Sequence, residues 1–418
     1  MAIPLANTAE ESPPPTKRLY DTAAIATPPG YRAELVAHDL TYPVGVTFDA
    51  EGTPYILEAG FAPGEAFTTP RVVKVEPTGN VVVVAEGENP PWTGVAYHQG
   101  SLIVAEGGVF HGGRIVRIAP DRKRTVLAAG LPKLDDHGTH APAVSEDGWV
   151  YFGQNAVPEQ KDDGDASHTL GWLQRHPEFG GAVLRVRVEG GQPELVAWGF
   201  RNPTGLAFGP NGSLYATDND FQAVSTGLGK EDYLWRVDRG RWYGWPSTSP
   251  SFQRVSVERS GMDKVPFPML RDSRPQGPPK PAALFENRGK LTGLDFSKNP
   301  EFGQEGKAFV VELGGSAASA KACGFAISTI DPKTGTIASF ATNQPLYDGV
   351  ESSAGGGGFE RPIDVRFDPK GEALYVVDFG WIRKKGDTSK RSMMRSGALW
   401  RIVRDPDARP ILYQTASL

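Results

Sequence analysis

The sequence predicts an all-β protein, a six-bladed β-propeller of four-stranded antiparallel blades whose ring is closed by an N-terminal strand. Three observations predict it. Glycine and proline supply 50 and 36 of the 418 residues, and so many helix breakers disfavour a helical bundle. Short apolar segments alternate with turn residues along the chain. One two-hairpin pattern returns six times, which is the number expected for a six-bladed ring.

Each copy of the pattern opens with a hairpin whose second strand ends in an acid or, in one copy, an amide. The first strands start at the marker residues Gly45, Gly94, Ala141, Gly205, Gly293 and Asp364. A second hairpin follows each copy, as in RVVKVEPTGNVVVVAEG from Arg71, so each blade receives four strands. We expect loops over 157–180, 219–232, 246–290 and 343–360, and loops of this length are often functional.

We expect a flexible, proline-rich leader over 1–27, followed by a single domain over 28–418. The segment 31–40 (YRAELVAHDL) has no partner in its own repeat, and we expect it to pair with the last blade and seal the ring. The first residues show no signal-peptide pattern, and no apolar stretch reaches the length of a membrane helix. Because Cys323 is the single cysteine, an internal disulfide and a cysteine-based zinc site are excluded.

The charge balance argues against a nucleic-acid partner. The formal net charge is −5, whereas proteins that bind phosphate backbones present a clustered basic face. We therefore look for the chemistry in residues that the repeat brings together.

The repeat register predicts which distant residues meet at one mouth of the propeller. The innermost strands line the axis of such a fold, and the loops that enter them crowd one end. His137 and Arg201 lie four residues before their markers, Asn202 and Arg361 lie three before theirs, and Asn89 precedes the second marker. We expect an imidazole and two guanidiniums at this mouth.

The identity of that imidazole is open, because two histidines occur in the segment DDHGTH before the third marker. His137 has the register of Arg201, and His140 competes with it for the same role. The side chain of histidine titrates near neutral pH, which suits a general base.

Carboxylates recur where the second strand of each blade ends. The six residues at this position are Glu58, Glu106, Gln154, Asp218, Glu312 and Asp378. For most of them the favoured interpretation is that they accept hydrogen bonds from turns and hold the blades together. A denser group, Asp218, Asp220, Glu231 and Asp232, surrounds the end of that strand in the fourth blade. Oxygen ligands of this kind suit Ca²⁺, although no EF-hand spacing is present.

Several segments resemble the glucose/sorbosone dehydrogenase family, whose best-known members are soluble PQQ-dependent sugar dehydrogenases. They are GFRNPTGLAFGPNGSLYATDND (199–220), RWYGWP (241–246), LDDHGTH (134–140), HTLGWLQRHPEF (168–179) and FERPIDVRFDPKGEALYVVDFG (359–380). The resemblance covers essentially residues 29–404. The first two segments together are specific for this family, because generic propeller repeats do not carry both.

The resemblance implies a cofactor, a base and an activity. PQQ would lie across the funnel on bound Ca²⁺, and the enzyme would oxidise an aldose or a sorbosone-type sugar for an external electron acceptor. His137 would take the proton of the anomeric hydroxyl while hydride passes to the quinone, with Asp136 orienting its ring. Such quinoproteins usually mature outside the cytoplasm, which implies a periplasmic or secreted protein.

The resemblance also implies which residues hold the quinone. Arg201 and Asn202 would bind the quinone oxygens, and Arg361 would grip a cofactor carboxylate. Asn89 fills a position that the family occupies with an amide, and Lys321 is the nearest candidate for a lysine of the fifth blade.

The calcium ion of the resemblance would fall on Asp232, with Glu231, Asp218 and Asp220 nearby and backbone carbonyls near Tyr243. One position departs from the family pattern. Ile363 stands where PQQ-binding relatives carry a second arginine, and one carboxylate contact of the cofactor is lost with it.

Two other functions are compatible with a propeller. A metal-dependent lactonase would use the axial carboxylates to hold a cation that activates water, which requires these side chains to point inward. A non-catalytic carbohydrate- or protein-binding propeller would use tryptophans as stacking platforms. The tryptophans considered are Trp92, Trp172, Trp242, Trp245 and Trp381.

Overall fold

The computed structural model describes most of the chain. The described ranges are 17–62, 66–131, 138–155, 181–221, 231–244, 277–286, 289–314, 324–343, 357–382 and 394–408. Within them, the side chains of Asp220, Phe221 and Glu286 are not described. No helix in these ranges is long and apolar enough to cross a membrane.

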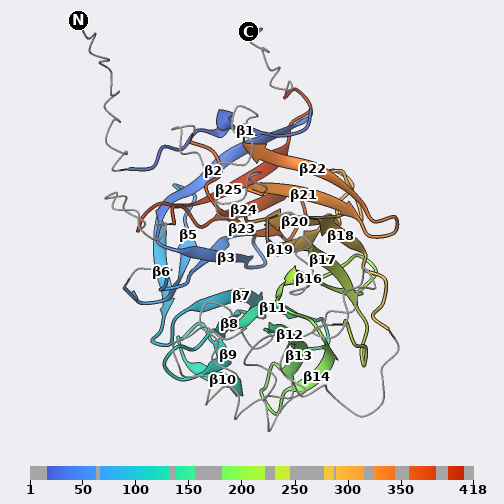
Figure 1. Cartoon of the computed structure of the whole chain (residues 1–418). Helices are drawn as coiled ribbons and strands as arrows, with labels where there is room; N and C mark the ends of the chain where they lie inside the picture. The colour runs from blue at the N-terminus through green and yellow to red at the C-terminus, as the bar shows by residue number, and fades with distance from the viewer. Residues whose placement is uncertain are drawn as a thin grey trace, which may run out of the picture.

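Six antiparallel sheets follow one another around a centre in the order of the chain (Figure 1). From the innermost strand outward, the first three blades contain β3 (Pro43–Phe48), β4 (Pro54–Glu58), β5 (Arg71–Val75) and β6 (Val81–Glu86); β7 (Trp92–His98), β8 (Ser101–Glu106), β9 (Gly113–Ile118) and β10 (Arg124–Leu131); and β11 (Thr139–Val144), β12 (Trp149–Gln154), β13 (Ala182–Arg187) and β14 (Glu194–Trp198). The last three contain β15 (Pro203–Phe208), β16 (Leu214–Phe221), β17 (Glu231–Val237) and β18 (Ala283–Glu286); β19 (Leu291–Phe296), β20 (Ala308–Glu312), β21 (Ala326–Asp331) and β22 (Thr336–Asn343); and β23 (Pro362–Phe367), β24 (Ala373–Asp378), β25 (Gly397–Arg404) and β2 (Tyr31–Leu40). The predicted six-bladed propeller is confirmed.

The ring closes as the sequence predicts. Strand β2 pairs with β25 from Tyr31 opposite Arg404 to Leu40 opposite Gly397, so the N-terminal strand completes the last blade. The innermost strand β23 also contacts β3 of the first blade, which closes the ring around the axis. Main-chain pairing of β2 thus completes the sixth blade, and packing of β23 against β3 joins that blade to the first.

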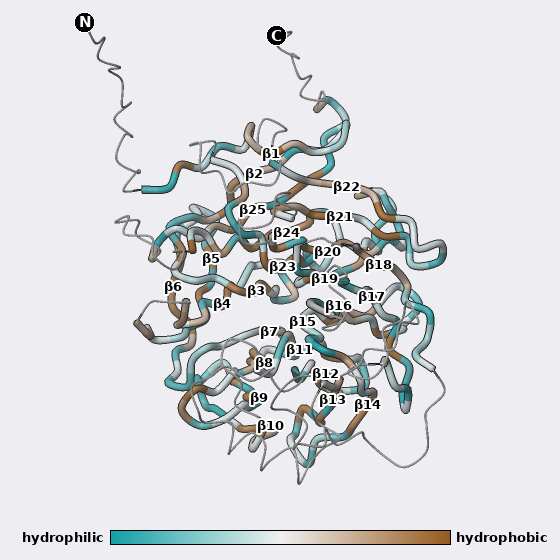
Figure 2. Tube along the Cα trace, in the orientation of Figure 1, coloured by the Kyte–Doolittle hydropathy of each residue, from teal (hydrophilic) through white to brown (hydrophobic). Residues whose placement is uncertain are grey.

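Burial follows the position of each strand in its blade. Neighbouring blades cover both faces of β24 (ALYVVD), and every one of its residues is buried. The outermost strand β6 instead exposes several residues, including Val82. The hydropathy colouring shows apolar stretches within the blades and polar stretches at outer turns (Figure 2).

The small marker residues let adjacent innermost strands approach closely. A Cβ atom added at Gly293 would lie 2.5 Å from the Cα atom of Asp364, and one added at Gly94 would lie 2.6 Å from that of Ala141. Real Cβ atoms do not come this near to backbone, so these positions require glycine. The glycine at these two markers thus has a physical reason in the geometry of the ring.

Two expectations about the loops need correction. The predicted loop 246–290 contains a strand, because β18 pairs its residue Leu284 with Tyr233 and becomes the outer strand of the fourth blade. The predicted loop 219–232 is shorter, since β16 runs to Phe221 and β17 begins at Glu231. The sequence did not predict the outer strand because β18 begins at Ala283, far along the chain from the end of its partner β17 at Val237.

The end of the expected leader is also structured. Residues 22–24 form a single turn of 3₁₀ helix, η1 (Thr22–Ala24), and β1 (Ile25–Ala26) adds a fifth strand to the fifth blade by pairing with β22. Arg18 is 2% exposed. The described part of the segment 1–27 therefore packs on the propeller, because it buries apolar and charged groups against the fifth and sixth blades.

Candidate functional site

The residues that end the second strand of each blade occupy one equivalent position, as predicted. Each pairs with the first residue of the innermost strand, two residues before the marker: Pro43 with Glu58, Trp92 with Glu106, Thr139 with Gln154, Pro203 with Asp218, Leu291 with Glu312 and Pro362 with Asp378. All six side chains are buried. They stand at the end of the propeller where the loops enter the innermost strands.

Two of these side chains hold segments at the start of their blades. Glu58 accepts a hydrogen bond from the backbone N–H of Thr41 at 2.6 Å and pairs with Arg71. Glu106 accepts one from Nδ2 of Asn89 at 2.8 Å and pairs with Arg124.

Two further members bond to strand residues of their own blades. Glu312 accepts from the hydroxyl of Ser328, and Gln154 accepts from the hydroxyl of Thr139. These hydrogen bonds and ion pairs occupy side-chain oxygens that a metal-dependent lactonase would use for its cation, which disfavours that alternative.

Asp218 builds the turn that carries Arg201 and Asn202. Its Oδ1 accepts hydrogen bonds from the backbone N–H of Asn202 at 2.6 Å and of Arg201 at 3.1 Å, and its Oδ2 accepts one from Nε1 of Trp235 at 3.3 Å. Burial raises the pKa of Asp218 to about 6, and the two backbone N–H groups oppose that rise. The turn is therefore fixed by a fully buried carboxyl group.

The side chain of Asn202 is oriented by a second amide. Nδ2 of Asn202 donates to Oδ1 of Asn219 at 2.7 Å, while Nδ2 of Asn219 donates to the carbonyl of Leu291 at 2.8 Å. A carbonyl only accepts, so this chain of bonds fixes which atom of each amide is nitrogen.

The atom left over is the amide oxygen of Asn202. It is buried and accepts no hydrogen bond from any described residue, although the whole side chain is only 2% exposed. Asn155 is the register equivalent of Asn219 in the third blade. Its Oδ1 is likewise buried and accepts no hydrogen bond from any described residue. Buried oxygens of this kind suit an N–H or O–H donor, or a hard cation, supplied from outside the described chain.

Asp378 builds the equivalent turn in the sixth blade. Its two oxygens accept the backbone N–H groups of Arg361 at 2.7 Å and Glu360 at 2.8 Å. The guanidinium of Arg361 lies 5.3 Å from the centre of the Phe325 ring, and the residue is 8% exposed. The fourth and sixth blades thus present Arg201–Asn202 and Glu360–Arg361 from turns of the same construction at the same end of the ring.

Asn89 ties together two loops of the second blade. Its Nδ2 donates to Glu106 and, at 3.1 Å, to the carbonyl of Gly112, while its Oδ1 accepts the backbone N–H of His111 at 3.0 Å. The amide therefore uses its hydrogen bonds within the blade, and the structure gives it a supporting place beside the mouth.

Four of the predicted site residues fall outside what the structure describes. They are Asp136, His137, Lys321 and the side chain of Asp220. His140 is described: it is the second residue of β11, is 9% exposed and lies opposite Gly153. It stands one residue before the third marker, and so at the mouth end of an innermost strand.

The predicted calcium residues that are described make hydrogen bonds within the chain. Oδ2 of Asp232 accepts the backbone N–H of Leu291 at 3.3 Å, and the hydroxyl of Tyr233 donates to Glu231. Tyr243 stacks on Phe200 with ring centres 4.3 Å apart, and its hydroxyl donates to the carbonyl of Arg236 at 2.6 Å. Burial raises the pKa of Tyr243 to about 12.

No three His, Cys, Asp or Glu side chains gather into a metal-binding group in the part of the chain that the structure describes. The tryptophan platforms are also limited. Trp92 is 0% and Trp381 is 8% exposed, so these two rings belong to the core, while Trp172 and Trp245 lie outside the described ranges.

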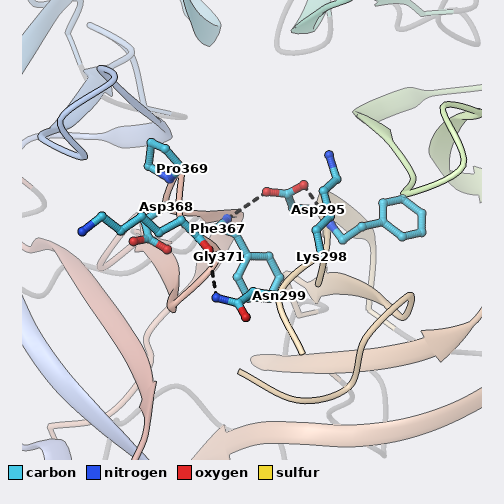
Figure 3. Close-up of a pocket in the computed structure, with 9 residues that line it drawn as sticks. Asp295, Lys298, Asn299, Phe367, Asp368, Pro369 and Gly371 are labelled. Carbon is cyan, nitrogen blue, oxygen red and sulfur yellow. Dashed lines mark hydrogen bonds between the residues drawn. The ribbon is translucent and has the colours of Figure 1, made fainter. Parts of the chain in front are cut away.

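A pocket of about 280 Å³ lies at the opposite end of the ring (Figure 3). It is lined by residues where β19 and β23 end, including Asp295, Lys298, Asp368 and Lys370, whereas the turns of Arg201 and Arg361 precede their innermost strands. Asp295 accepts the backbone N–H of Phe367 at 2.8 Å across the two blades. No predicted site residue lines this pocket.

Sequence reasoning missed three residues that shape the mouth. Asn219 orients Asn202, Phe325 lies beside Arg361, and Arg18 donates to Asp378 at 2.6 Å. Asn219 stands next to the recurring carboxylate position, and this adjacency is a signal that could have found it. The sequence holds no comparable signal for Phe325 or Arg18.

Part of the sequence is similar to a curated protein. Over 144 residues, 29% of this chain, it is 28% identical to quinoprotein glucose dehydrogenase B of Acinetobacter calcoaceticus. The match covers 28% of that protein's length, and no family model matches the chain.

Solved structures share the fold over most of their length. The PQQ domain of pyranose dehydrogenase from Coprinopsis cinerea, in its holo form, is 16% identical with a TM-score of 0.61, covering 93% of this chain and 98% of that one. The PQQ-bound aldose sugar dehydrogenase of Streptomyces coelicolor (18% identical, TM-score 0.57) and the apo form of the soluble enzyme from Escherichia coli (16%, 0.57) each cover 90% of this chain and 99% of theirs. The resemblance noted in the sequence is confirmed.

Proposed function

We propose that the protein is a PQQ-dependent dehydrogenase that oxidises an aldose or a sorbosone-type sugar. The observation that carries the proposal is the pair of matching turns that bring Arg201–Asn202 and Arg361 to one mouth of the propeller. The partial similarity to a quinoprotein glucose dehydrogenase and the shared fold of PQQ-binding sugar dehydrogenases support it.

The chemistry of these residues fits the cofactor. PQQ is a planar ortho-quinone that carries carboxylates, and when bound it accepts hydride. Guanidinium groups bind carboxylates through two parallel hydrogen bonds and stabilise negative charge, so Arg201 and Arg361 would hold and polarise such a molecule.

Asn202 fits in a different way from the one that the sequence suggests. Because its Nδ2 donates to Asn219, the group that it offers is the oxygen, which accepts a hydrogen bond or binds a cation. We therefore assign Asn202 to an N–H or O–H group of the ligand, or to a cation beside it, and assign the quinone oxygens to Arg201.

The proposal keeps His137 as the general base that takes the proton of the sugar hydroxyl, with Asp136 holding its ring and His140 as the competing imidazole. Lys321 is proposed as a further cofactor contact. Exchange of each histidine for alanine separates them: loss of the base lowers kcat by about 10²–10⁴-fold, whereas loss of a bystander leaves it near wild type.

Calcium is a second component of the proposal. Asp232, Glu231, Asp218 and Asp220 remain its predicted ligands together with carbonyls near Tyr243, since Ca²⁺ takes several oxygen ligands from loops. Treatment of the PQQ-loaded protein with a chelator, followed by Ca²⁺ or Mg²⁺, tests this. We expect activity to fall and to return with Ca²⁺.

An external electron acceptor and a periplasmic or secreted location complete the proposal. The direct test reconstitutes apo protein with PQQ and Ca²⁺ and follows the reduction of a redox dye with a panel of aldoses and sorbosone. Dye reduction that depends on PQQ and on sugar supports the proposal. A protein that binds PQQ saturably but reduces no dye with any sugar would contradict the substrate class.

A further inference from the structure

The N-terminal segment 17–26, which lies outside the repeats, packs against the loop that carries Arg361. Strand β1 pairs with β22 of the fifth blade, and the backbone N–H of Asp21 donates to the carbonyl of Gly357 at 2.9 Å. A Cβ atom added at Gly357 would lie 2.8 Å from the nitrogen of Asp21, so the two backbones are in close contact.

Arg18 is the buried centre of this contact. Its Nη2 donates to Oδ2 of Asp378 at 2.6 Å and to the carbonyl of Gly358 at 2.7 Å, and its Nη1 donates to the carbonyl of Ser396 at 2.7 Å. The side chains of Arg18 and Asp378 are 1% and 0% exposed. One guanidinium thus joins the aspartate, the loop before β23 and the residue that precedes β25.

Asp378 in turn holds the backbone of the residues proposed to bind the cofactor. The oxygen that accepts from Arg18 also accepts the N–H of Glu360, and the other oxygen accepts the N–H of Arg361. Arg18 is therefore two hydrogen bonds away from the peptide group that sets the position of Arg361.

The sixth blade differs from the first and second in the source of the arginine that pairs with its recurring acid. Glu58 and Glu106 hold the same register position as Asp378, and each pairs with an arginine of its own blade, Arg71 and Arg124. In the sixth blade the guanidinium comes from the N-terminal segment instead. The sixth-blade turn therefore depends on a part of the chain that is not in the propeller repeat.

We propose that Arg18 is a positioning residue for Arg361, acting through Asp378 and the carbonyl of Gly358. Removing it would leave the Asp378 carboxylate buried without its cation and the Gly358 carbonyl without its donor, so the 357–361 loop would loosen. The effect on the backbone rests on contacts alone, whereas the effect on ligand binding rests on the proposed function.

Hydrogen exchange of the apo protein tests the backbone effect without any cofactor. In Arg18→Ala we expect the amides of 359–361 to exchange at least about tenfold faster than in the wild type, because their opening free energy falls. The matching turn at Arg201–Asn202 is the internal control and should keep its protection. Arg18→Lys retains the positive charge but not the planar guanidinium with its several N–H donors, so its exchange rate should be intermediate.

The matched control is Lys17→Ala. Lys17 precedes Arg18 in the same segment, but its side chain is 70% exposed and forms only a surface pair with Asp39 at 3.5 Å. We expect this variant to exchange like the wild type. Unchanged protection of 359–361 in Arg18→Ala, or equal acceleration in both turns, would overturn the proposal. If Arg18→Ala does not fold, Arg18→Lys takes its place: unchanged protection of 359–361, or equal acceleration in both turns, would then overturn the proposal.

A PQQ titration then measures the consequence at the site. We expect Arg18→Ala to weaken PQQ binding by roughly tenfold or more, while Lys17→Ala binds like the wild type. If exchange changes as expected but PQQ affinity does not, Arg18 does not position Arg361 for this ligand. If the wild type itself binds no PQQ, the proposed function fails, and the exchange result still decides whether Arg18 holds the loop.

Discussion

Two turns show how single buried carboxyl groups define the mouth of this propeller. Asp218 and Asp378 each accept two consecutive backbone N–H groups, and each thereby places a residue pair that includes an arginine. The second strands thus fix the backbone of the residues proposed to bind the cofactor, although these residues precede the innermost strands.

At the residue scale, Asn202→Ala tests whether the unshared amide oxygen contacts the ligand. We expect PQQ affinity to fall by roughly tenfold and the free energy of unfolding of the apo protein to fall by about 1–3 kcal/mol, because Asn219 loses its donor. Asn211→Ala is the matched control, since Asn211 caps an exposed turn of the same blade. Equal PQQ affinity in Asn202→Ala and wild type would contradict the assignment.

The pH dependence of stability tests a second buried carboxyl group. Asp364 accepts the N–H of Val46, and burial raises its pKa to about 6, with Arg366 opposing the rise and Asp295 adding to it. A folded pKa above the unfolded value means that folding favours the protonated form. Its contribution to stability is therefore complete below about pH 4 and is lost as the pH rises through about 6.

Asp364→Asn removes this titration. We expect the free energy of unfolding to change less steeply between pH 4 and pH 6 than in the wild type, by up to about 1.4 kcal/mol per pH unit for the lost proton. Denaturant unfolding of the apo protein at several pH values measures the slope. Asp218, whose pKa is also raised to about 6, keeps its own contribution in the variant. Identical slopes would contradict the assignment to Asp364.

At the scale of the strand, the marker glycines are what allow the innermost strands to meet. Gly293→Ala would place a methyl group 2.5 Å from the Cα atom of Asp364, so backbone must move. We expect a loss of about 1–3 kcal/mol in unfolding free energy, as overpacked sites show. Gly277→Ala, where a Cβ atom meets nothing within 4 Å, is the control and should be near neutral. Thermal unfolding of both variants compares them.

The strands also show what a sequence can reveal about this fold. The innermost strands and the equivalent carboxylate position were predictable because they repeat at fixed offsets from the markers. Strand β18 was not, since its pairing with β17 spans a segment without periodic signal. The partner of Asp378 was not predictable either, because nothing local to Arg18 specifies an ion pair with a residue 360 positions away.

Across the whole molecule, β2 completes the last blade and so closes the ring. Ala37 of this strand is 1% exposed and packs in the cluster shared by the first and sixth blades. We expect Ala37→Asn to lower the free energy of unfolding by about 2–4 kcal/mol, because it buries an unpaired amide and overfills the core. Fluorescence and circular dichroism should report a single transition.

The control for ring closure is His38→Asn, which introduces the same side chain one residue further along. The side chain of His38 is 50% exposed, so the change should be within about 0.5 kcal/mol of the wild type. A loss in Ala37→Asn no larger than in this control would show that closure through β2 does not limit stability.

The mouth built by Asp218 and Asp378 is proposed to bind PQQ. The most direct test is an equilibrium titration of the apo protein with PQQ in the presence of Ca²⁺, followed by tryptophan fluorescence. We expect saturable binding at one site per chain. We also expect Arg201→Ala and Arg361→Ala each to weaken binding by about tenfold or more, while Lys298→Ala at the opposite end leaves it unchanged. Absence of saturable binding, or equal weakening in all three variants, would contradict it.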